Sequence, residues 1–391
     1  MNTVAIVKYD QTANPLRRAI ELCDGFEQLK TSDKVLIKPN AAGGLGKGQS
    51  PYGVVTTAMV MEDLVGLLRE YGCANITIGE GPILLPEFRW DAERAYERSG
   101  MWALSEKLGV PLVDFNEEEF VKVDLEGKSA KLSKRCLEAD FLINVPVLKT
   151  HRQAVVSLGL KNMKGCLHNS SKRRFHRDGL DRLIAVLGTV IKPYLTIIDG
   201  IYGLERGPWG TNAPRLDVII AGKDVLSCDI VGSTILGYDP KDVPHLVHFA
   251  ELTGRSLDLN TVNVKGQRVQ DVATKLEWRL EWVPAMLGAH NVGGITIEEP
   301  GASVCTACGL TVWMGIDNFL RENKGATFDS VEFCVGTGPK AREESKQVFL
   351  FGNCALNANK RRKDAIRLKG CPPTIEETYE LLKANAAKVS S

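Results

Sequence analysis

The sequence predicts an α/β fold: a mostly parallel sheet flanked by helices, followed by a smaller C-terminal α+β domain rich in cysteine. Two observations carry this prediction. In the first half of the chain, short runs of β-branched and apolar residues alternate with stretches whose apolar residues recur at helical spacing, which is typical of βαβ units. Near residue 255 the pattern changes, glycines become frequent, and half of the 10 cysteines follow. We therefore expect two domains, residues 1–254 and residues 255–391.

The individual elements follow from local patterns. Helical spacing predicts a helix at 15–29, where Pro15 suits a first turn, and another at 56–71, which Gly72 ends. Residues 113–133 break the alternation and are expected to form a hairpin that turns at Glu126 and Gly127. Apolar runs predict strands at 4–9, 34–38, 75–78, 139–145, 194–198 and 216–220. In the second domain we expect a tryptophan-bearing helix at 278–282, a helix after Cys308, strands at 330–335 and 347–351, and a closing helix after Cys371.

The composition excludes several classes of protein. The 391 residues are 44% hydrophobic and 25% charged, an ordinary globular balance, and the net charge of +1 provides no overall field to attract nucleic acid or anionic membranes. No stretch approaches the roughly 18–20 uninterrupted apolar residues that a membrane span needs. The N-terminus lacks the pattern of a signal peptide. We therefore expect a cytoplasmic protein whose cysteines are reduced or bind metal.

Four cysteines of the second domain are candidate metal ligands. Cys305 and Cys308 form a C-x-x-C motif, whose tight turn brings two sulfurs to one side. Cys354 follows Gly352 at the end of a strand, where glycine lets the backbone approach closely. Cys371 precedes two prolines, which stiffen its turn. All four stand at loops or element ends, where ligands are usually displayed.

A set of four cysteines suits either a [4Fe–4S] cluster or zinc. Structural zinc commonly uses two C-x-x-C motifs, and this chain supplies one, whereas an isolated cysteine before Pro-Pro is commoner in iron–sulfur proteins. We therefore predict a [4Fe–4S] cluster, with zinc as the second candidate and reduced structural cysteines as the alternative without metal. Cys334 lies in an apolar strand, where a buried thiol needs no function.

Polar residues gather at the expected carboxyl ends of several strands, where open α/β sheets keep their ligand sites. A lone lysine at a strand end is usually a solvated cap, so this prediction depends on several residues converging. They would then form an electropositive pocket that clamps a carboxylate or phosphate, with a histidine or a desolvated lysine as acid or base. The candidates for substrate binding are Lys38, Asn40, Glu80, Asn162 and Asp199, and those for catalysis are Lys149, His151, Lys161 and Lys164.

Two further segments are less informative. The glycine-rich stretch 41–48 can offer backbone N–H groups to an anion, but it matches neither of the common nucleotide-binding motifs. The basic run 172–177 is expected to be a solvated face, or else a mobile loop or lid over the site.

Several motifs together resemble those of the domain-of-unknown-function family 362. They are, in chain order, KVLIKPN, the turn IGEG at 78–81, INVPVLKTH, LGLKNMKGC, LTIIDGIYGLE and IIAGKDVLSCDIVGSTILGYDP, and they cover roughly residues 2–250. The resemblance implies an α/β core with a site at Lys38, Asn40, Lys149, His151, Lys161, Asn162 and Lys164. It also implies a cluster, because many members of this family, widespread in anaerobic bacteria and archaea, are iron–sulfur proteins. This chain lacks the compact ferredoxin-type cysteine insert of many members and carries dispersed cysteines instead. The resemblance implies no particular reaction.

Three functions are compatible with these features. The first is a redox enzyme or electron-transfer protein acting on a small anionic substrate, because four cysteines saturate a cluster. The second is a [4Fe–4S] hydro-lyase or a metal-assisted isomerase, in which an open iron needs only three cysteines and leaves Cys354 or Cys371 spare. The third is a non-catalytic protein with a structural four-cysteine metal site. The expected partners are a small anion, a ferredoxin-like electron donor and a second copy of the chain, but neither nucleic acid nor a membrane.

Overall fold

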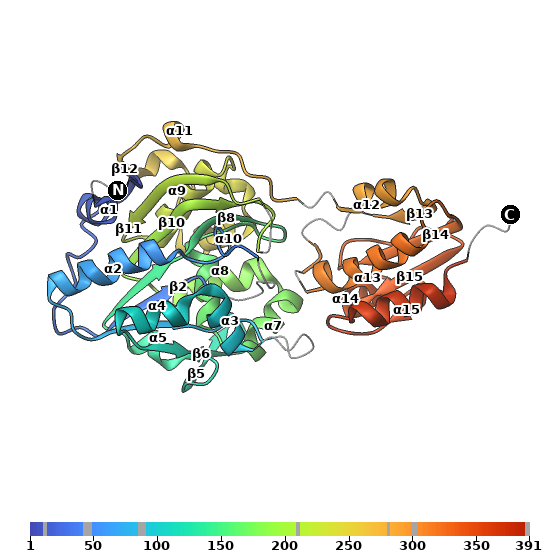
Figure 1. The fold of residues 1–391 in the computed structure, drawn as a ribbon, viewed down its shortest axis with the longest axis horizontal. Coiled ribbons are helices and arrows are strands. Elements are labelled where there is room, and N and C mark those ends of the chain that lie inside the picture. Colours follow the sequence, from blue (N-terminus) through green and yellow to red (C-terminus); the bar gives the residue numbers. More distant parts are fainter. Residues whose placement is uncertain are drawn as a thin grey trace. The chain divides into compact units, whose positions relative to one another are not determined.

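The computed structural model describes residues 1–10, 14–41, 49–84, 91–208, 212–279, 282–298, 303–305 and 307–387. The chain divides into two compact units, Met1–Trp278 and Arg279–Ser391 (Figure 1). The boundary thus lies after Trp278 and not near residue 254. The reason is strand β12 (Val262–Gly266), which pairs in parallel with β1 (Asn2–Lys8) and so belongs to the first unit.

The larger unit is built on a 10-stranded sheet in the order β12-β1-β11-β10-β7-β2-β3-β4, with β8 pairing to β10 and β9 to β8. Antiparallel pairing within this sheet is confined, among the described strands, to β1–β11, β10–β11 and β8–β9. The predicted α/β fold with a mostly parallel sheet is therefore confirmed. The remaining strands are Val35–Pro39 (β2), Ile76–Glu80 (β3), Leu112–Asp114 (β4), Phe141–Val145 (β7), Val147–His151 (β8), Val155–Ser157 (β9), Leu195–Leu204 (β10) and Arg215–Gly222 (β11).

Helices connect these strands, and the two whose ranges the sequence predicts, at 15–29 and 56–71, are present as α1 and α2. Helix α2 ends at Gly72, which takes the left-handed conformation (φ 102°) that glycine adopts without strain. Helix α1 is shorter than the predicted range 15–29, because the chain leaves the helix at Cys23 and turns at Asp24 (φ 53°). The helices are Pro15–Leu22 (α1), Ala58–Tyr71 (α2), Ala92–Ser99 (α3), Met101–Leu108 (α4), Lys134–Glu138 (α5), Gly159–Asn162 (α6), Asn169–Asp178 (α7), Leu180–Val190 (α8), Val225–Ile235 (α9), Pro244–Thr253 (α10) and Val269–Val272 (α11), with 3₁₀ turns at Met163–Cys166 (η2), Pro240–Asp242 (η3) and Leu259–Thr261 (η4).

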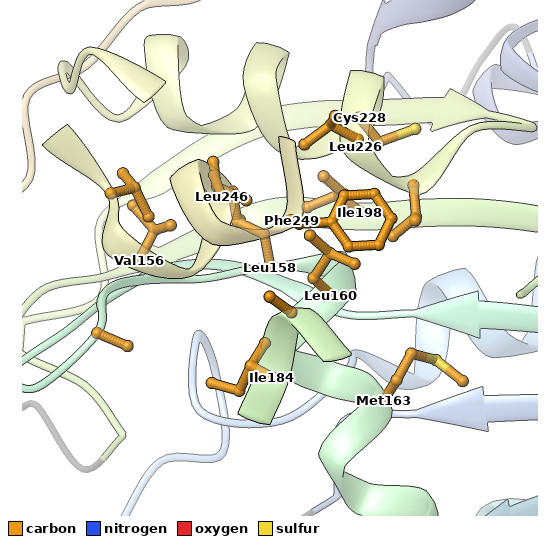
Figure 2. Close-up of a cluster of buried hydrophobic side chains, with 14 of the residues drawn as sticks. Val156, Leu158, Leu160, Met163, Ile184, Ile198, Leu226, Cys228, Leu246 and Phe249 are labelled. Atoms are coloured by element: carbon orange, nitrogen blue, oxygen red, sulfur yellow. The ribbon is translucent and has the colours of Figure 1, made fainter. Parts of the chain in front are cut away.

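Both faces of the large sheet are covered, which explains why its strands are almost continuous apolar runs. Successive residues of β1 point to opposite faces, so Val4 and Ile6 pack in one core while Ala5 and Val7 pack in the other. In the first of these cores, side chains from α6, α8, α9 and α10 meet the sheet around Ile198 (Figure 2). This packing places α6 against the sheet.

The hairpin predicted at 113–133 is present as β5 (Phe120–Leu125) and β6 (Lys128–Ser133), which pair antiparallel. It turns at Glu126 (φ 52°) and Gly127 (φ 76°), the two positive φ angles that a tight hairpin turn requires.

No helix in the part of the chain that the structure describes is long and apolar enough to cross a membrane.

The smaller unit contains a four-stranded sheet in the order β13-β14-β15-β16, with every described pair parallel. This arrangement is α/β and corrects the predicted α+β detail, since helices lie between the strands along the chain. The tryptophan-bearing helix expected at 278–282 begins at Trp282 instead. The elements are Trp282–His290 (α12), Gly293–Ile297 (β13), Cys308–Glu322 (α13), Thr327–Val335 (β14), Gln347–Phe351 (β15), Gly352–Ala358 (α14), Ile366–Leu368 (β16) and Ile375–Asn385 (α15).

Candidate functional site

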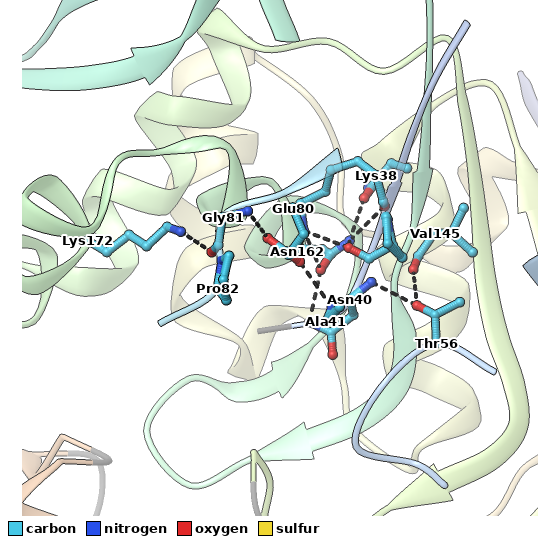
Figure 3. Close-up of polar contacts among 12 residues, drawn as sticks. Lys38, Asn40, Ala41, Thr56, Glu80, Gly81, Pro82, Val145, Asn162 and Lys172 are labelled. Carbon is cyan, nitrogen blue, oxygen red and sulfur yellow. Dashed lines mark hydrogen bonds and ion pairs between the residues drawn. The ribbon is translucent and has the colours of Figure 1, made fainter. Parts of the chain in front are cut away.

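The centre of the site is a buried ion pair at the carboxyl ends of β2 and β3. Lys38 Nζ lies 2.6 Å from Glu80 Oε2, and the two side chains are 0% and 1% exposed. Glu80 also accepts hydrogen bonds from the backbone N–H groups of Ala41 (3.1 Å) and Gly81 (2.9 Å). A buried charge is tolerated when it has both an opposite charge and hydrogen bonds, and this pair has both (Figure 3).

Asparagines connect this ion pair to neighbouring elements. Asn162 Oδ1 accepts hydrogen bonds from Lys38 Nζ (3.2 Å) and Asn40 Nδ2 (3.1 Å). Asn162 Nδ2 donates to Asn144 Oδ1 (2.8 Å), and Asn40 Oδ1 accepts from Lys149 Nζ (2.6 Å). One chain of hydrogen bonds therefore joins β2 to β7, β8 and α6, which follow it about 100 residues later in the sequence.

Helix α6, which carries Lys161 and Asn162, is held in place by a buried carboxylate. Asp229 accepts hydrogen bonds from the backbone N–H groups of Gly159 (2.6 Å) and Leu160 (2.9 Å). A Cβ atom at position 159 would lie only 2.7 Å from Asp229 Oδ1, so glycine is what lets the carboxylate approach. Burial raises the pKa of Asp229 to about 7.

Two histidines lie beside the lysines. His151 Nδ1 accepts hydrogen bonds from the backbone N–H groups of Gln153 (3.1 Å) and Ala154 (3.2 Å), which places the ring proton on Nε2. His176 lies between Lys164 Nζ, 2.9 Å from its Nε2, and Gln153 Oε1, 2.9 Å from its Nδ1. Burial and neighbouring lysines hold the pKa of both rings well below its usual value, so both are neutral at pH 7.

Positive charge is concentrated around these residues. Burial, reinforced by the charges of Lys161 and Lys38, lowers the pKa of Lys149 to about 7. Burial also lowers the pKa of Lys161 to about 8, although Asp181 opposes this shift. Among the described residues, the acids whose charges act on Lys149, Lys161 or Lys172 are Glu80, Asp114 and Asp181. We call the following six side chains the cation cluster: Lys38, Lys149, Arg152, Lys161, Lys164 and Lys172.

The structure brings most of the predicted residues together. Lys38, Asn40, Glu80, Lys149 and Asn162 form one hydrogen-bonded network, and His151, Lys161 and Lys164 lie beside it. The lysine and histidine expected after a strand end instead lie within a strand of their own, β8, because Pro146 separates it from β7.

Asp199 has a different position from the one expected. It lies inside β10, which continues to Leu204, and not at a strand end. Its two carboxylate oxygens accept hydrogen bonds from the backbone N–H groups of Thr57 (2.7 Å) and Ile201 (3.1 Å). In this arrangement Asp199 fixes the start of α2.

Sequence reasoning missed three members of the site: Asn144, Gln153 and His176. The basic run at 172–177, expected to be a solvated face or a lid, lies within helix α7. Lys172 is buried and donates to the carbonyl oxygen of Gly81, and Phe175 is buried in the core. The spacing of positions 172, 175 and 176 is that of one helix face, and this signal could have identified the run. The glycine-rich stretch after Asn40 lies outside the described residues from position 42 to 48.

The four candidate metal ligands of the smaller unit also converge. Cys308 is the first residue of α13, Cys354 lies in the first turn of α14, and Cys371 precedes α15. A side-chain hydrogen bond with Cys305, burial and the charges of Cys305, Cys354 and Cys371 hold the pKa of Cys308 far above its usual range. Thiols influence one another in this way only when they are close together.

Gly352 explains part of this convergence. It has φ 80°, and a Cβ atom there would lie 3.4 Å from Cys308 Sγ and 3.6 Å from the carbonyl oxygen of Gly370. The backbone N–H of Asn353 donates to that same carbonyl oxygen (3.0 Å). The turn that carries Cys371 is thereby held against the turn that carries Cys354.

Comparison with known proteins identifies the family. The family model described as Domain of unknown function (DUF362) matches residues 35–234, more than half of the chain. The chain belongs to this family. The DUF362 region contains the ion pair, the asparagines and the whole cation cluster, whereas the four cysteines at 305, 308, 354 and 371 lie beyond it.

Two similar proteins accompany the DUF362 match. A thylakoid-associated protein of Synechocystis sp. (strain ATCC 27184 / PCC 6803 / Kazusa) is 29% identical over 237 residues, which are 59% of this chain and 71% of that protein. The lactate racemase apoprotein from Thermoanaerobacterium thermosaccharolyticum is 15% identical with a TM-score of 0.38, covering 59% of this chain and 57% of the racemase chain.

The DUF362 match does not identify a metal, because the four candidate cysteines lie outside the matched residues. All 10 cysteines lie within the described residues, and none forms a disulfide. Within the ranges that the structure describes, no three or more His, Cys, Asp or Glu side chains stand in an arrangement that could hold a metal ion as they are placed. The iron–sulfur and zinc predictions therefore stay predictions.

Proposed function

We propose that this chain is an iron–sulfur oxidoreductase or electron-transfer protein whose larger unit binds a small anionic substrate, either a carboxylate or a phosphate. The observation that carries the substrate proposal is a group of lysines at the centre of the cation cluster: Lys149, Lys161 and Lys172 each lie within electrostatic reach of Lys38, whose ion-pair partner is the fully buried Glu80. Concentrating like charges in a place of low dielectric constant costs free energy, and an anion that enters recovers part of it.

Within the cluster, the lysines have different tasks. Lys38 is neutralised by Glu80 and serves to position Asn162. Lys149 and Lys161 carry no carboxylate bonded to their Nζ atoms in the described contacts, where Lys149 bonds to Asn40 and the carbonyl oxygen of Val54. Their charge is the part that an incoming anion would balance.

Acid–base chemistry is available beside the bound anion. A group with a pKa near 7 both accepts and releases protons efficiently at neutral pH, and the pKa of Lys149 is about 7. His151 is neutral, with Nε2 carrying the proton, so it can donate a hydrogen bond from that nitrogen to an oxygen of the substrate. These two residues of β8 are the candidates for moving a proton.

The four cysteines fit a cluster by their chemistry. They present four thiols from the starts of α13 and α14 and the turn before α15, and the positive end of the 15-residue helix α13 favours a thiolate at Cys308. Binding iron requires the thiols to lose their protons, which reverses the raised pKa of Cys308. When bound, a [4Fe–4S] cluster supplies one-electron transfer. Convergence of four cysteines rather than three supports this role over an open-iron hydro-lyase.

Anion binding tests the substrate part of the proposal. Calorimetric titration of the full chain with inorganic phosphate and with acetate at pH 6 should detect binding of at least one of them. Lys149→Met, which keeps the length of the side chain but removes its charge, is expected to weaken that affinity about tenfold or more, the effect of losing one charged hydrogen bond. Wild-type protein that binds neither anion would overturn the proposal.

Metal analysis tests the cluster part separately. Protein purified without oxygen should contain about four iron and four acid-labile sulfide per chain and show an EPR signal on reduction. One zinc per chain, with no acid-labile sulfide, would refute the cluster and indicate a structural zinc site instead. The proposal keeps the cytoplasmic location and the ferredoxin-like electron donor expected from the sequence, which cell fractionation and reduction by a ferredoxin would test.

A further inference from the structure

Gln153 lies in the site but has no task in the proposed function. It belongs to the turn at 152–154 that joins β8 to β9, and its side chain is buried. Gln153 Oε1 lies 2.9 Å from His176 Nδ1, and His176 Nε2 lies 2.9 Å from Lys164 Nζ. We call these three side chains the histidine bridge. The direction of its two hydrogen bonds determines what the Gln153 amide can do.

Lys164 fixes that direction. An ammonium group only donates hydrogen bonds, so Nε2 of the neutral His176 ring accepts from Lys164 and the ring proton is on Nδ1. Nδ1–H then donates to Gln153, which requires the amide oxygen at this position and not the NH₂ group. The NH₂ group of Gln153 is therefore turned away from His176 and is available to another acceptor.

The Gln153 NH₂ group and the ring N–H of His151 are both open to a ligand. Among the described residues, neither Gln153 Nε2 nor His151 Nε2 takes part in a hydrogen bond. Neither nitrogen belongs to the described polar atoms that are both fully buried and without a partner, so both keep access to solvent. The two residues are themselves only 8% and 2% exposed. Two buried side chains thus present donors that a bound molecule would pair.

The β8–β9 hairpin places these donors beside two lysines. Lys149 and His151 are two residues apart on β8 and share one face, and Ser157 lies opposite Lys149 on β9. Lys161 Nζ lies 3.5 Å from Ser157 Oγ. The hairpin therefore contacts the α6–η2 segment at two points, through Ser157 and through the histidine bridge, and His151 lies between them along the hairpin.

We propose that Gln153 is a substrate-binding residue that makes the anion site prefer a phosphate group to a carboxylate. This inference rests on the proposed anion site and selects between its two candidate anions. Lys149 and Lys161 supply the charge, and Gln153 and His151 add two neutral N–H donors. A carboxylate has two oxygens and a phosphate group has three or four. Only the phosphate group has enough oxygens for each of these side chains to find its own acceptor.

The preference follows from the donors that a poorer ligand would leave unpaired. A donor that loses water on binding and gains no acceptor weakens affinity, so a site built to hydrogen-bond one ligand rejects an analogue that lacks the acceptor. A glutamine is also suited to a place beside several lysines, because it adds a donor without adding a further like charge.

The test is calorimetric titration of the full chain at pH 6 with inorganic phosphate and with acetate. The wild type should bind phosphate at least about tenfold more tightly than acetate. Gln153→Met has a side chain of similar length without the NH₂ group. It should weaken phosphate binding about tenfold, the effect of losing one hydrogen bond to a charged group, and change acetate binding by less than about twofold.

Two further variants separate this role from a general effect of the substitution. His176→Leu removes the N–H that orients the Gln153 amide and should weaken phosphate binding in the same direction, by about threefold. Gln270→Met makes the same substitution at an exposed glutamine of α11 and should leave both affinities unchanged.

Nuclear magnetic resonance of wild-type protein labelled with ¹⁵N-glutamine gives a second measurement that does not depend on the folding of a variant. The side-chain amide signal of Gln153, identified by its absence in Gln153→Met, should shift on addition of phosphate. A purely structural glutamine would keep its signal in place.

The outcomes are distinguishable. If phosphate binds, but Gln153→Met binds it as tightly as the wild type and the Gln153 signal does not move, the role of Gln153 is refuted while the anion site stands. Acetate binding as tight as phosphate binding would also refute the preference and leave the site in place. If the wild type binds neither anion, the anion site itself fails, and this inference fails with it.

Discussion

Gly165 lies against the buried ion pair, and its replacement by alanine should disrupt the site. A Cβ atom at position 165 would lie 2.1 Å from Glu80 Oε1 and 2.4 Å from Lys38 Nζ. Contacts between non-bonded heavy atoms are favourable at about 3.5–4.0 Å, so the overlap exceeds 1 Å. Neither side chain can retreat freely, because Glu80 is also bonded to the backbone of Ala41 and Gly81.

The expected cost follows from what must move. Inserting a methyl group into a packed interior costs about 1–3 kcal/mol when the surroundings adjust, and separating a buried ion pair costs about 3–5 kcal/mol. We expect Gly165→Ala to lower the free energy of unfolding by about 3–5 kcal/mol, the larger of these two costs. With a urea m-value of about 3 kcal/mol per M, the unfolding midpoint would fall by at least about 1 M.

The assay is urea unfolding of the full chain, followed by circular dichroism, with hydrogen exchange of β2 and β3 to assign the transition to the larger unit. Gly66→Ala is the matched control: position 66 lies within α2 and a Cβ atom there meets nothing within 4 Å. It should stabilise the protein by about 0.5–1 kcal/mol, because alanine is the better helix former. A Gly165→Ala protein with a wild-type midpoint would refute the tight packing around the ion pair.

Four further predictions follow: two concern pH, one the cysteines and one the closing helix. Phosphate affinity should fall as pH rises from 6 to 9 in calorimetric titrations, because Lys149 and Lys161 lose charge around pH 7 and 8. Over the same window the unliganded protein should become more resistant to urea, because unfolded lysines keep protons that the folded ones release. Cys305→Ser should lose iron and the visible absorbance of the cluster and lower the melting temperature of the smaller unit. Cys334→Ala, which alters a buried thiol on β14, should keep its iron; full iron content in Cys305→Ser would refute that cysteine as a ligand. Thr374→Ala removes one half of the capping box of α15 and should cost about 1 kcal/mol, measured as a shift of roughly 4–8 °C in melting temperature, and an unchanged value would show that the cap contributes nothing.

Much of this protein was determined by local sequence patterns. The apolar runs at 139–145 and 216–220, the end of α2 at Gly72 and the turn at Glu126 and Gly127 each depend on the properties of a few neighbouring residues. Strand ends also predicted which polar residues lie together, because parallel strands deliver their carboxyl ends to one edge of the sheet. For that reason the order of strands and polar residues along the chain was enough to group Lys38 and Glu80.

Other features depended on contacts between distant segments, which no local pattern contains. The domain boundary moved because β12 adds to the sheet beside β1, and Asp199 became a support for α2 because β10 continues past it. His176 and Gln153 joined the site because α7 packs with one face inward. Sequence determined the kinds of residue available to this protein. Tertiary structure alone decided which of them share a buried environment, and that environment sets their charge.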